Sequence, residues 1–196
     1  MTGAPERSRF QECEFVDIQA SDCHVGHAVF DRCTFEDILS EDTTTLHEAE
    51  FLECTFRGMV RYLNFGAVPY AASPFHSQTR QRQAIENLAS RPFGIDVSQA
   101  TLEECSVVGD EFTRKLRFRR EQGFLVRGER LDLILEPELR DTQDLDFAEC
   151  LTTPVANGVS QNVHFCAIPT RARHRRDYYV ARVRELGVEL LEDPMC

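Results

Sequence analysis

The chain has no long apolar run, which excludes the usual membrane-spanning helix. No part of its 196 residues reaches the roughly 18 consecutive apolar residues that such a helix requires. The first ten residues, MTGAPERSRF, become charged at once and lack the apolar core of a signal peptide. We therefore expect a cytoplasmic protein that does not enter a membrane.

The short motifs that mark common enzymes are also missing. The sequence contains neither the GxGxxG nor the P-loop nucleotide-binding motif. It also lacks the GxSxG motif of serine hydrolases and the HExxH motif of zinc proteases. These absences favour a non-enzymatic protein, and we expect no cofactor.

The eight cysteines include no pair with CxxC spacing. Cys23-His24 and the His164-Phe165-Cys166 triplet each offer two metal ligands, but neither has the second close pair that makes a zinc site specific. Free cysteine usually behaves as a small buried apolar residue. We therefore expect reduced, buried thiols and no metal site.

One six-residue phrase occurs three times in the first 60 residues. It reads Phe-x-x-Cys-x-Phe at positions 10–15, 30–35 and 51–56, so its copies are 20 and 21 residues apart. A fixed period of about 20 residues is typical of a chain that winds in stacked coils. The phrase predicts that equivalent phenylalanines and cysteines stack on one another inside the coils.

Apolar residues in this region recur every five positions, and four such fives make one coil. The positions between them are mostly acidic, and we expect them to face outward and bind a partner. The candidate partner-binding residues are Glu12, Glu14, Asp17, Asp31, Glu36 and Asp37.

With this spacing, residues 8–56 resemble a degenerate pentapeptide-repeat protein, a family in which a small, a polar and then a Leu or Phe residue recur every five positions. The resemblance implies a mainly β fold built on a short right-handed parallel β-helix, or solenoid. It covers about a quarter of the chain and breaks at residues 40–45, SEDTTT. More faintly, the C-terminal AIPTRARHRRDYYVARVRELGV is similar to the ends of uncharacterised actinobacterial proteins that begin with such coils, which implies no known activity.

The rest of the chain predicts a single domain, 1–196, with a helical insertion and a C-terminal α/β cap. We expect regular coils over 8–60, a loop and helix insertion over 61–98, wider irregular coils over 99–160 and a strand-helix cap over 161–196. The insertion contains a predicted helix at Thr79–Ala89, and the cap a strand before Pro169 followed by a helix at Arg171–Leu186. Weaker echoes of the phrase predict that Cys105 and Cys150 continue the cysteine stack, with one coil near Phe124 between them.

Two groups of residues are candidates for chemistry. Asp141, Asp144 and Asp146 could serve acid-base or metal chemistry, as grouped aspartates do in β-helix enzymes that cleave acidic sugars, although a polar turn alone also favours Asp. Histidines could activate a cysteine, but a thiol in apolar surroundings has a raised pKa and is inert. The histidines are His24, His27, His47 and His76.

The net charge of −11 is unevenly spread. Residues 1–60 hold 13 acidic residues against 4 Arg, whereas residues 114–130 hold 7 basic residues against 2 Glu. The second block contains a candidate basic patch, Lys115, Arg117 and Arg119. Overall acidity argues against direct binding of nucleic acid, and an acidic face favours a protein partner with a basic surface.

Three functions follow from these observations. The leading hypothesis is an acidic protein-binding module, such as an immunity-type or inhibitory partner that covers a basic active site. The resemblance implies a second, a DNA mimic that regulates a type II topoisomerase, although three coils about 4.8 Å apart are short for that role. The third is an enzyme whose acidic cluster lies on a β-helix wall. The sequence does not determine the oligomeric state.

Overall fold

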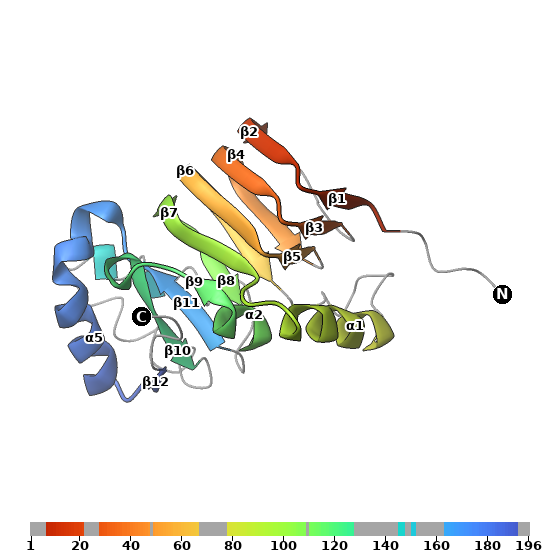
Figure 1. The fold of residues 1–196 in the computed structure, drawn as a ribbon. Coiled ribbons are helices and arrows are strands. Elements are labelled where there is room, and N and C mark those ends of the chain that lie inside the picture. Colours follow the sequence, from red (N-terminus) through yellow and green to blue (C-terminus); the bar gives the residue numbers. More distant parts are fainter. Residues whose placement is uncertain are drawn as a thin grey trace.

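The computed structural model describes residues 7–21, 28–47, 49–66, 78–108, 110–127, 145–147, 150–151 and 163–191. Within these residues the structure is mainly β, with parallel strands stacked at one end and a smaller antiparallel region with helices at the other (Figure 1). The strands that pair only in parallel are β1 (Arg9–Gln11), β2 (Glu14–Ala20), β3 (Val29–Asp31), β4 (Thr34–His47), β5 (Glu50–Leu52), β6 (Cys54–Gly66), β7 (Ile95–Glu103) and β9 (Leu116–Arg117).

The remaining elements lie between these strands or after them along the chain. The strands are β8 (Ser106–Val108), β10 (Gly123–Arg127), β11 (Val163–Ala167) and β12 (Leu190–Leu191). The helices are α1 (Gln78–Ala89), α2 (Asp110–Arg114) and α5 (Arg176–Glu185), with 3-10 helices η1 (Arg120–Gln122) and η3 (Thr170–Arg175).

The three phrases stack in register, as the 20-residue period predicts. We call β1 with β2 the first layer, β3 with β4 the second, and β5 with β6 the third. Phe10 pairs with Phe30 and Phe30 with Phe51 across β1, β3 and β5. The second phenylalanine of each phrase is paired in the same way across β2, β4 and β6: Phe15, Phe35 and Phe56.

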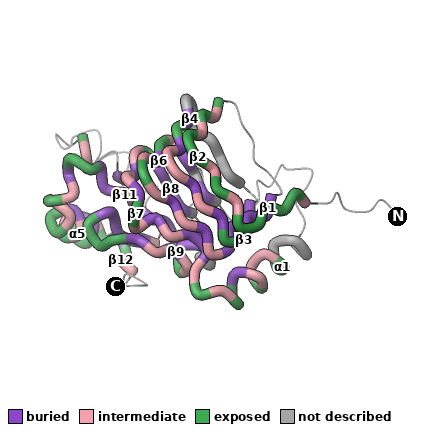
Figure 2. Tube along the Cα trace, turned by 45° about the horizontal axis from the view of Figure 1, so that its top comes forward, coloured by how far each residue is buried: buried purple, intermediate pink, exposed green. Residues whose placement is uncertain are grey.

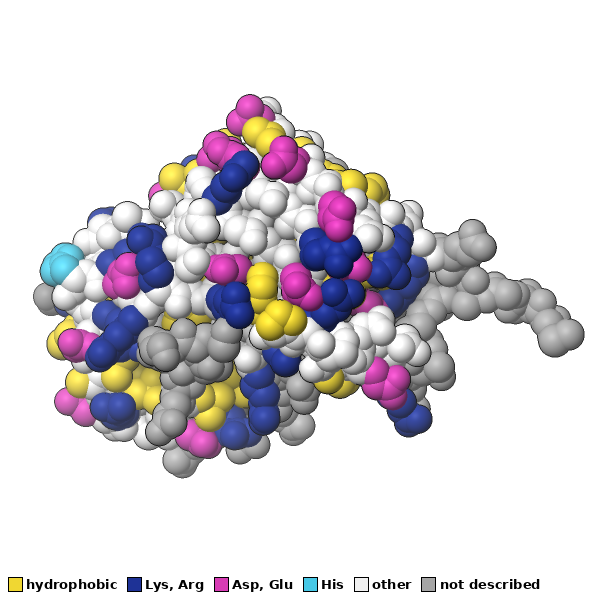
Figure 3. Space-filling view, in the orientation of Figure 1, with side chains coloured by type: hydrophobic (Ala, Val, Ile, Leu, Met, Phe, Trp, Pro, Cys, Tyr) yellow, Lys and Arg dark blue, Asp and Glu magenta, His cyan; other side chains and the backbone are white. Residues whose placement is uncertain are grey.

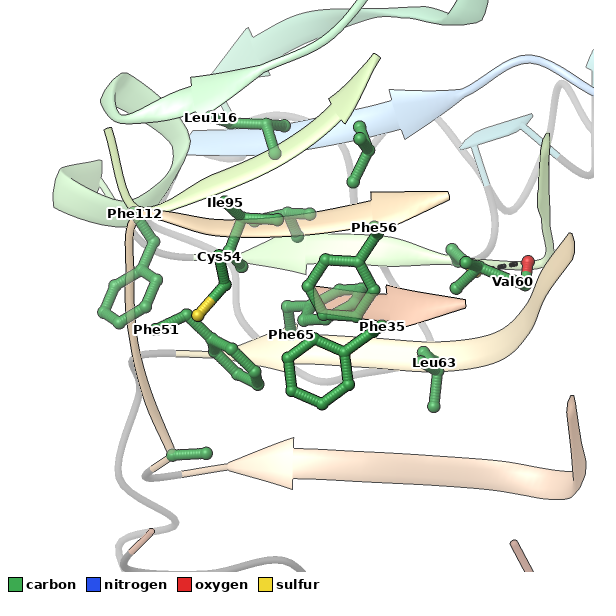
Figure 4. Close-up of a cluster of buried hydrophobic side chains, with 14 of the residues drawn as sticks. Phe35, Phe51, Cys54, Phe56, Val60, Leu63, Phe65, Ile95, Phe112 and Leu116 are labelled. Atoms are coloured by element: carbon green, nitrogen blue, oxygen red, sulfur yellow. Dashed lines mark hydrogen bonds between the residues drawn. The ribbon is translucent and has the colours of Figure 1, made fainter. Parts of the chain in front are cut away.

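The aromatic rings form two stacked columns. Within the columns the ring centroids are 4.6 to 5.2 Å apart and the rings are nearly parallel. Between the columns the rings meet edge to face, which is a favourable arrangement for aromatic pairs. Figure 4 shows how Phe65 meets Phe51 and Phe56 at the third layer, where the columns end.

Each phrase makes a corner in the chain. The residue before the cysteine has a positive φ, and the cysteine thiol donates a hydrogen bond to the carbonyl oxygen two residues earlier. The residues with positive φ before a cysteine are Glu12, Arg32, Glu53 and Glu104. A second set of left-handed corners lies five residues later, at Asp17, Asp37 and Gly58. The phrase therefore encodes a turn as well as an apolar core.

The predicted column of five cysteines is only partly correct. Cys54 is followed in the stack by Ile95 and then by Leu116, not by Cys105. Cys105 forms the same kind of corner between β7 and β8, and its thiol donates to the carbonyl oxygen of Val60 at 3.3 Å. Cys150 lies in a helical turn and packs in a second core with Tyr179. The phrase describes a local conformation and does not determine its place in the stack.

The insertion between the third layer and β7 is shorter than the predicted range of 61–98. Residues 61–66 extend β6, and residues 95–98 already belong to β7. The predicted helix is confirmed as α1, and its buried residue Leu88 packs in the same core as the phenylalanines. α1 contacts β5, so it covers part of the outer side of the sheet formed by β1, β3 and β5.

Wider coils are predicted over 99–160. For the described residues of this range that follow β9, the prediction is wrong. Phe124 lies in β10, which pairs antiparallel with β11 and β12 and so forms no parallel coil. Its side chain belongs to the second core, beneath α5. The alternating pattern correctly indicates a strand but does not fix the direction in which that strand pairs. The remaining parts, 128–144, 148–149 and 152–160, lie outside the described residues.

The predicted strand before Pro169 is confirmed as β11, and the predicted helix is divided into η3 and α5. Beside them, Gln122 joins the C-terminal region to the stack. Its buried amide nitrogen donates to the carbonyl oxygens of Val97 at 2.9 Å and Ala100 at 2.8 Å. Its amide oxygen accepts from the Arg119 backbone at 2.6 Å. Gln122 thus satisfies carbonyl groups of β7 at this end of the stack.

Burial rises from the first layer to the third (Figure 2). Phe10 is 36% exposed, its equivalent Phe30 is 6% exposed and Phe51 is 1% exposed. The inner residues of the third layer therefore lie at the centre of the core, whereas those of the first layer remain accessible.

The corner at Gly58 gives a stability prediction. Its φ is +69°, and an added Cβ would lie against the Asp37 carboxylate, which accepts a hydrogen bond from the Met59 backbone at 2.8 Å. We expect Gly58→Ala to lower the free energy of unfolding, measured by urea denaturation, by about 1–3 kcal/mol. In an Asp37→Ala background the added cost should be smaller, since the contact is gone. Unchanged stability of the single variant would contradict this account of the corner.

Candidate protein-binding surface

The six predicted partner-binding residues divide into three groups by exposure. Glu12, Glu14 and Asp17 in the first layer are exposed, Glu36 and Asp37 in the second layer are half-buried, and Asp31 is buried. The structure therefore does not bring all six together on one open acidic face.

Asp31 corrects the sequence prediction. Its side chain points outward from β3 but is covered, and the residue is only 2% exposed. Its Oδ2 atom accepts from Arg9 at 2.8 Å and from Arg91 at 3.3 Å. Arg91 follows α1, so a segment 60 residues further along the chain covers this position. Asp31 is part of an internal ion-pair network and is not available to a partner.

Glu36 and Asp37 hold neighbouring layers together. Glu36 pairs with Arg57 of the third layer at 2.7 Å. Asp37 accepts from the Met59 backbone across the same two layers. Much of the acidic charge of the second layer is therefore used inside the protein.

The first layer differs from the second in this respect. Within the described residues, the side chains of Glu14 and Asp17 form no hydrogen bond or ion pair. Glu12 pairs with Arg32 at 2.7 Å, but its side chain stays 65% exposed. In the same layer Phe10 is 36% exposed and Val16 is 48% exposed. Acidic and apolar side chains lie together at the β2 end of the molecule, at the top of Figure 3.

The three residues of the candidate basic patch make three separate contacts within the protein. Lys115 donates to the carbonyl oxygen of Arg91 at 2.6 Å, just after the end of α1. Arg117 stacks on Phe93, with 4.1 Å between the guanidinium carbon and the ring centroid. Arg119 pairs with Glu121 at 3.4 Å. Each of the three residues thus has a partner of its own within the protein.

A polar cavity of about 360 Å³ lies between α1 and the outer side of β3 and β5, and none of the predicted acidic cluster or histidines lines it. Its lining includes three arginines, whose charges are met by buried carboxylates: Arg7 pairs with Glu50, and Arg9 and Arg91 pair with Asp31. Asn87 of α1 also donates to Glu50, at 3.2 Å. No short motif marks this cavity, because residues from four separate segments form it.

The buried thiols have raised pKa values, as the sequence predicts for apolar surroundings. Burial raises the pKa of Cys54 and of Cys105 to about 12, and it also raises the pKa of Cys33. Each of these thiols donates to backbone carbonyl oxygens. A thiol with such a pKa is almost entirely protonated at neutral pH, so it is a poor nucleophile.

The other candidate residues form no described chemical site. Asp146 pairs with Arg171 at 2.6 Å, while Asp141 and Asp144 lie outside the described residues. His24, His27 and His76 also lie outside them, and the His47 side chain is not described. Among the described residues, no group of three or more His, Cys, Asp or Glu side chains is placed to hold a metal ion.

No helix in the described part of the chain combines the length and apolar character needed to cross a membrane.

Comparison with known proteins gives no further guide to the site. No family model, curated protein or solved structure matches the chain.

The difference between Asp31 and Glu14 can be tested by stability. We expect Asp31→Ala to lower the free energy of unfolding by about 1–3 kcal/mol, because it removes a buried carboxylate that accepts from both Arg9 and Arg91. Glu14→Ala should change it by less than about 0.5 kcal/mol, since this side chain is exposed. Chemical denaturation of the two variants measures both values. Equal effects would show that Asp31 is not part of a buried network.

The raised pKa of Cys54 predicts a pH dependence. A thiol pKa of about 12 in the folded protein against 9.0 for an ordinary thiol means that folding favours the protonated form. The resulting stability is fully present below pH 9.0 and is lost as pH rises toward 12. Between these values the free energy of unfolding should fall less steeply in Cys54→Ala than in the wild type. Parallel slopes in the two proteins would contradict this.

Proposed function

We propose that the protein is a non-enzymatic, cytoplasmic protein-binding module with an acidic first layer that binds a basic partner. The observation that carries the proposal is the exposure of Glu12, Glu14 and Asp17, whereas the acids of the next layer are half-buried or buried. A partner of this kind would be a protein whose basic active site or binding surface is covered and inhibited, as in toxin and immunity pairs.

We further propose that the stacked layers form a short right-handed β-helix of the degenerate pentapeptide-repeat kind. Three features support this assignment: parallel strands one period apart, stacked phenylalanines, and left-handed corners five residues apart in each layer. Right-handed winding is the expected hand, since parallel strands in one sheet are nearly always joined by right-handed connections. Such a scaffold is rigid and presents its outer side chains at fixed positions.

The charge arrangement favours a local binding site over an acidic rod. A DNA mimic needs acidic charge along the whole stack, but Glu36 is paired with Arg57 and Glu103 with Arg61. Acidic and basic side chains are interspersed on the face in Figure 3. At the first layer, in contrast, unpaired carboxylates can attract and orient a basic partner over several ångströms.

Affinity capture tests the proposal. The immobilised wild-type chain should retain a basic protein from the extract of its own cells at low salt and release it at high salt, because salt screens exposed charges. The variant Glu12→Gln, Glu14→Gln, Asp17→Asn should lose this partner. Mass spectrometry of the retained protein measures both results.

A matched variant supplies the control. Glu86, Glu121 and Glu185 are also exposed acids but lie on α1, η1 and α5. Changing all three to Gln removes the same charge and should leave capture intact. Retention of no basic protein by the wild type, or equal loss in both variants, would argue against a binding site on the first layer.

A further inference from the structure

The first layer is the end of both stacks of strands. β1 is the terminal strand in the order β1-β3-β5, and β2 is the terminal strand beside β4. No described strand pairs with the other side of β1 or β2 (Figure 1). The backbone therefore has an open edge at this end.

The open edge of β2 carries unpaired backbone groups. The carbonyl oxygen of Cys13 accepts from the Thr34 backbone at 2.9 Å and so points toward β4. Since backbone groups of successive residues in a strand point alternately to opposite sides, those of Glu14 and Val16 point away from β4. Such groups are available to pair with an added strand.

The side chains at this end have the form of an incomplete core. Phe10, Cys13, Phe15 and Ile18 are exposed or only half-buried. Their equivalents in the second layer are all buried: Phe30, Cys33, Phe35 and Ile38. An added segment with the same apolar spacing would bury the first layer as the first layer buries the second.

Charge decides between a second copy and a different protein. Two copies that met through this edge would bring their Glu12, Glu14 and Asp17 side chains together, and like charges across a strand pair are unfavourable. A segment with Lys or Arg at the outward positions would instead meet these carboxylates. The opposite end of the stack is closed by Gln122.

We propose that the protein binds its partner by strand addition: an extended segment with apolar inward residues and basic outward residues pairs with β2 and covers Phe15 and Ile18. This inference deepens the proposed function and rests on it. The backbone pairing supplies the affinity, and Glu14 with Asp17 selects basic segments.

A synthetic peptide tests this mode directly. The basic probe has the sequence of residues 29–40 with Asp31→Asn, Thr34→Lys, Glu36→Val and Asp37→Lys, so that lysines lie over Glu14 and Asp17. The acidic control has Thr34→Glu and keeps Asp37. With the full-length chain, we expect the basic peptide to bind about tenfold more tightly in calorimetry and to slow hydrogen exchange of the Glu14 and Val16 amides.

A charge exchange in the protein provides the matched control. Glu14→Lys with Asp17→Lys should reverse the preference, so that the acidic peptide binds more tightly. Glu86→Lys with Glu121→Lys adds the same charge elsewhere and should keep the wild-type preference. Circular dichroism of each variant verifies that it is folded.

Three results would overturn strand addition. The first is unchanged hydrogen exchange of the β2 amides with saturating peptide, and the second is an unchanged peptide preference in the charge-exchanged variant. The third is a wild-type dimer in sedimentation whose β2 amides are already protected without peptide. Capture of a basic protein without protection of β2 would leave the proposed function standing and reject this mode. Protection of β2 by the basic peptide without any captured protein would support the mode and reject the proposed partner.

Discussion

The structure depends on the stacking of equivalent phenylalanines from one layer to the next. The ring centroids in a column are 4.6 to 5.2 Å apart, close to the spacing of about 4.7–4.9 Å between paired strands. Identical side chains at identical positions can therefore pack without adjustment of the backbone. Because a shift of one residue would turn every side chain to the other side of its strand, this core also fixes the register.

The same constraint determines which polar residues are free to function. With the inside filled by repeated apolar residues, each layer is joined to the next outside by ion pairs such as Glu36 with Arg57. An acidic residue in the interior of the stack thus has a neighbour above and below that can neutralise it. At the first layer one neighbour is missing, and Glu14 and Asp17 remain unpaired among the described residues.

The sequence predicts the register of the three layers well because local spacing determines it. It fails where distant segments meet. The phrase at Cys105 forms the same corner as the earlier copies, yet its position depends on how the chain returns after α1. Asp31 looks like an outer residue in the repeat, and only the contact with Arg91 shows that it is covered. Neither contact leaves a periodic signal, since each joins residues far apart in the chain.

The two ends of the stack face the same physical problem and solve it differently. A terminal strand leaves backbone groups and apolar side chains without partners, which favours uncontrolled association unless it is covered or charged. At the other end the Gln122 amide binds carbonyl oxygens of β7, and the C-terminal strand β11 pairs with β8. At β2 the edge stays open, and carboxylates beside it oppose pairing with a second copy. Under the proposed strand addition, the same carboxylates favour pairing with a basic strand, so protection against self-association and selection of a partner would follow from one set of charges.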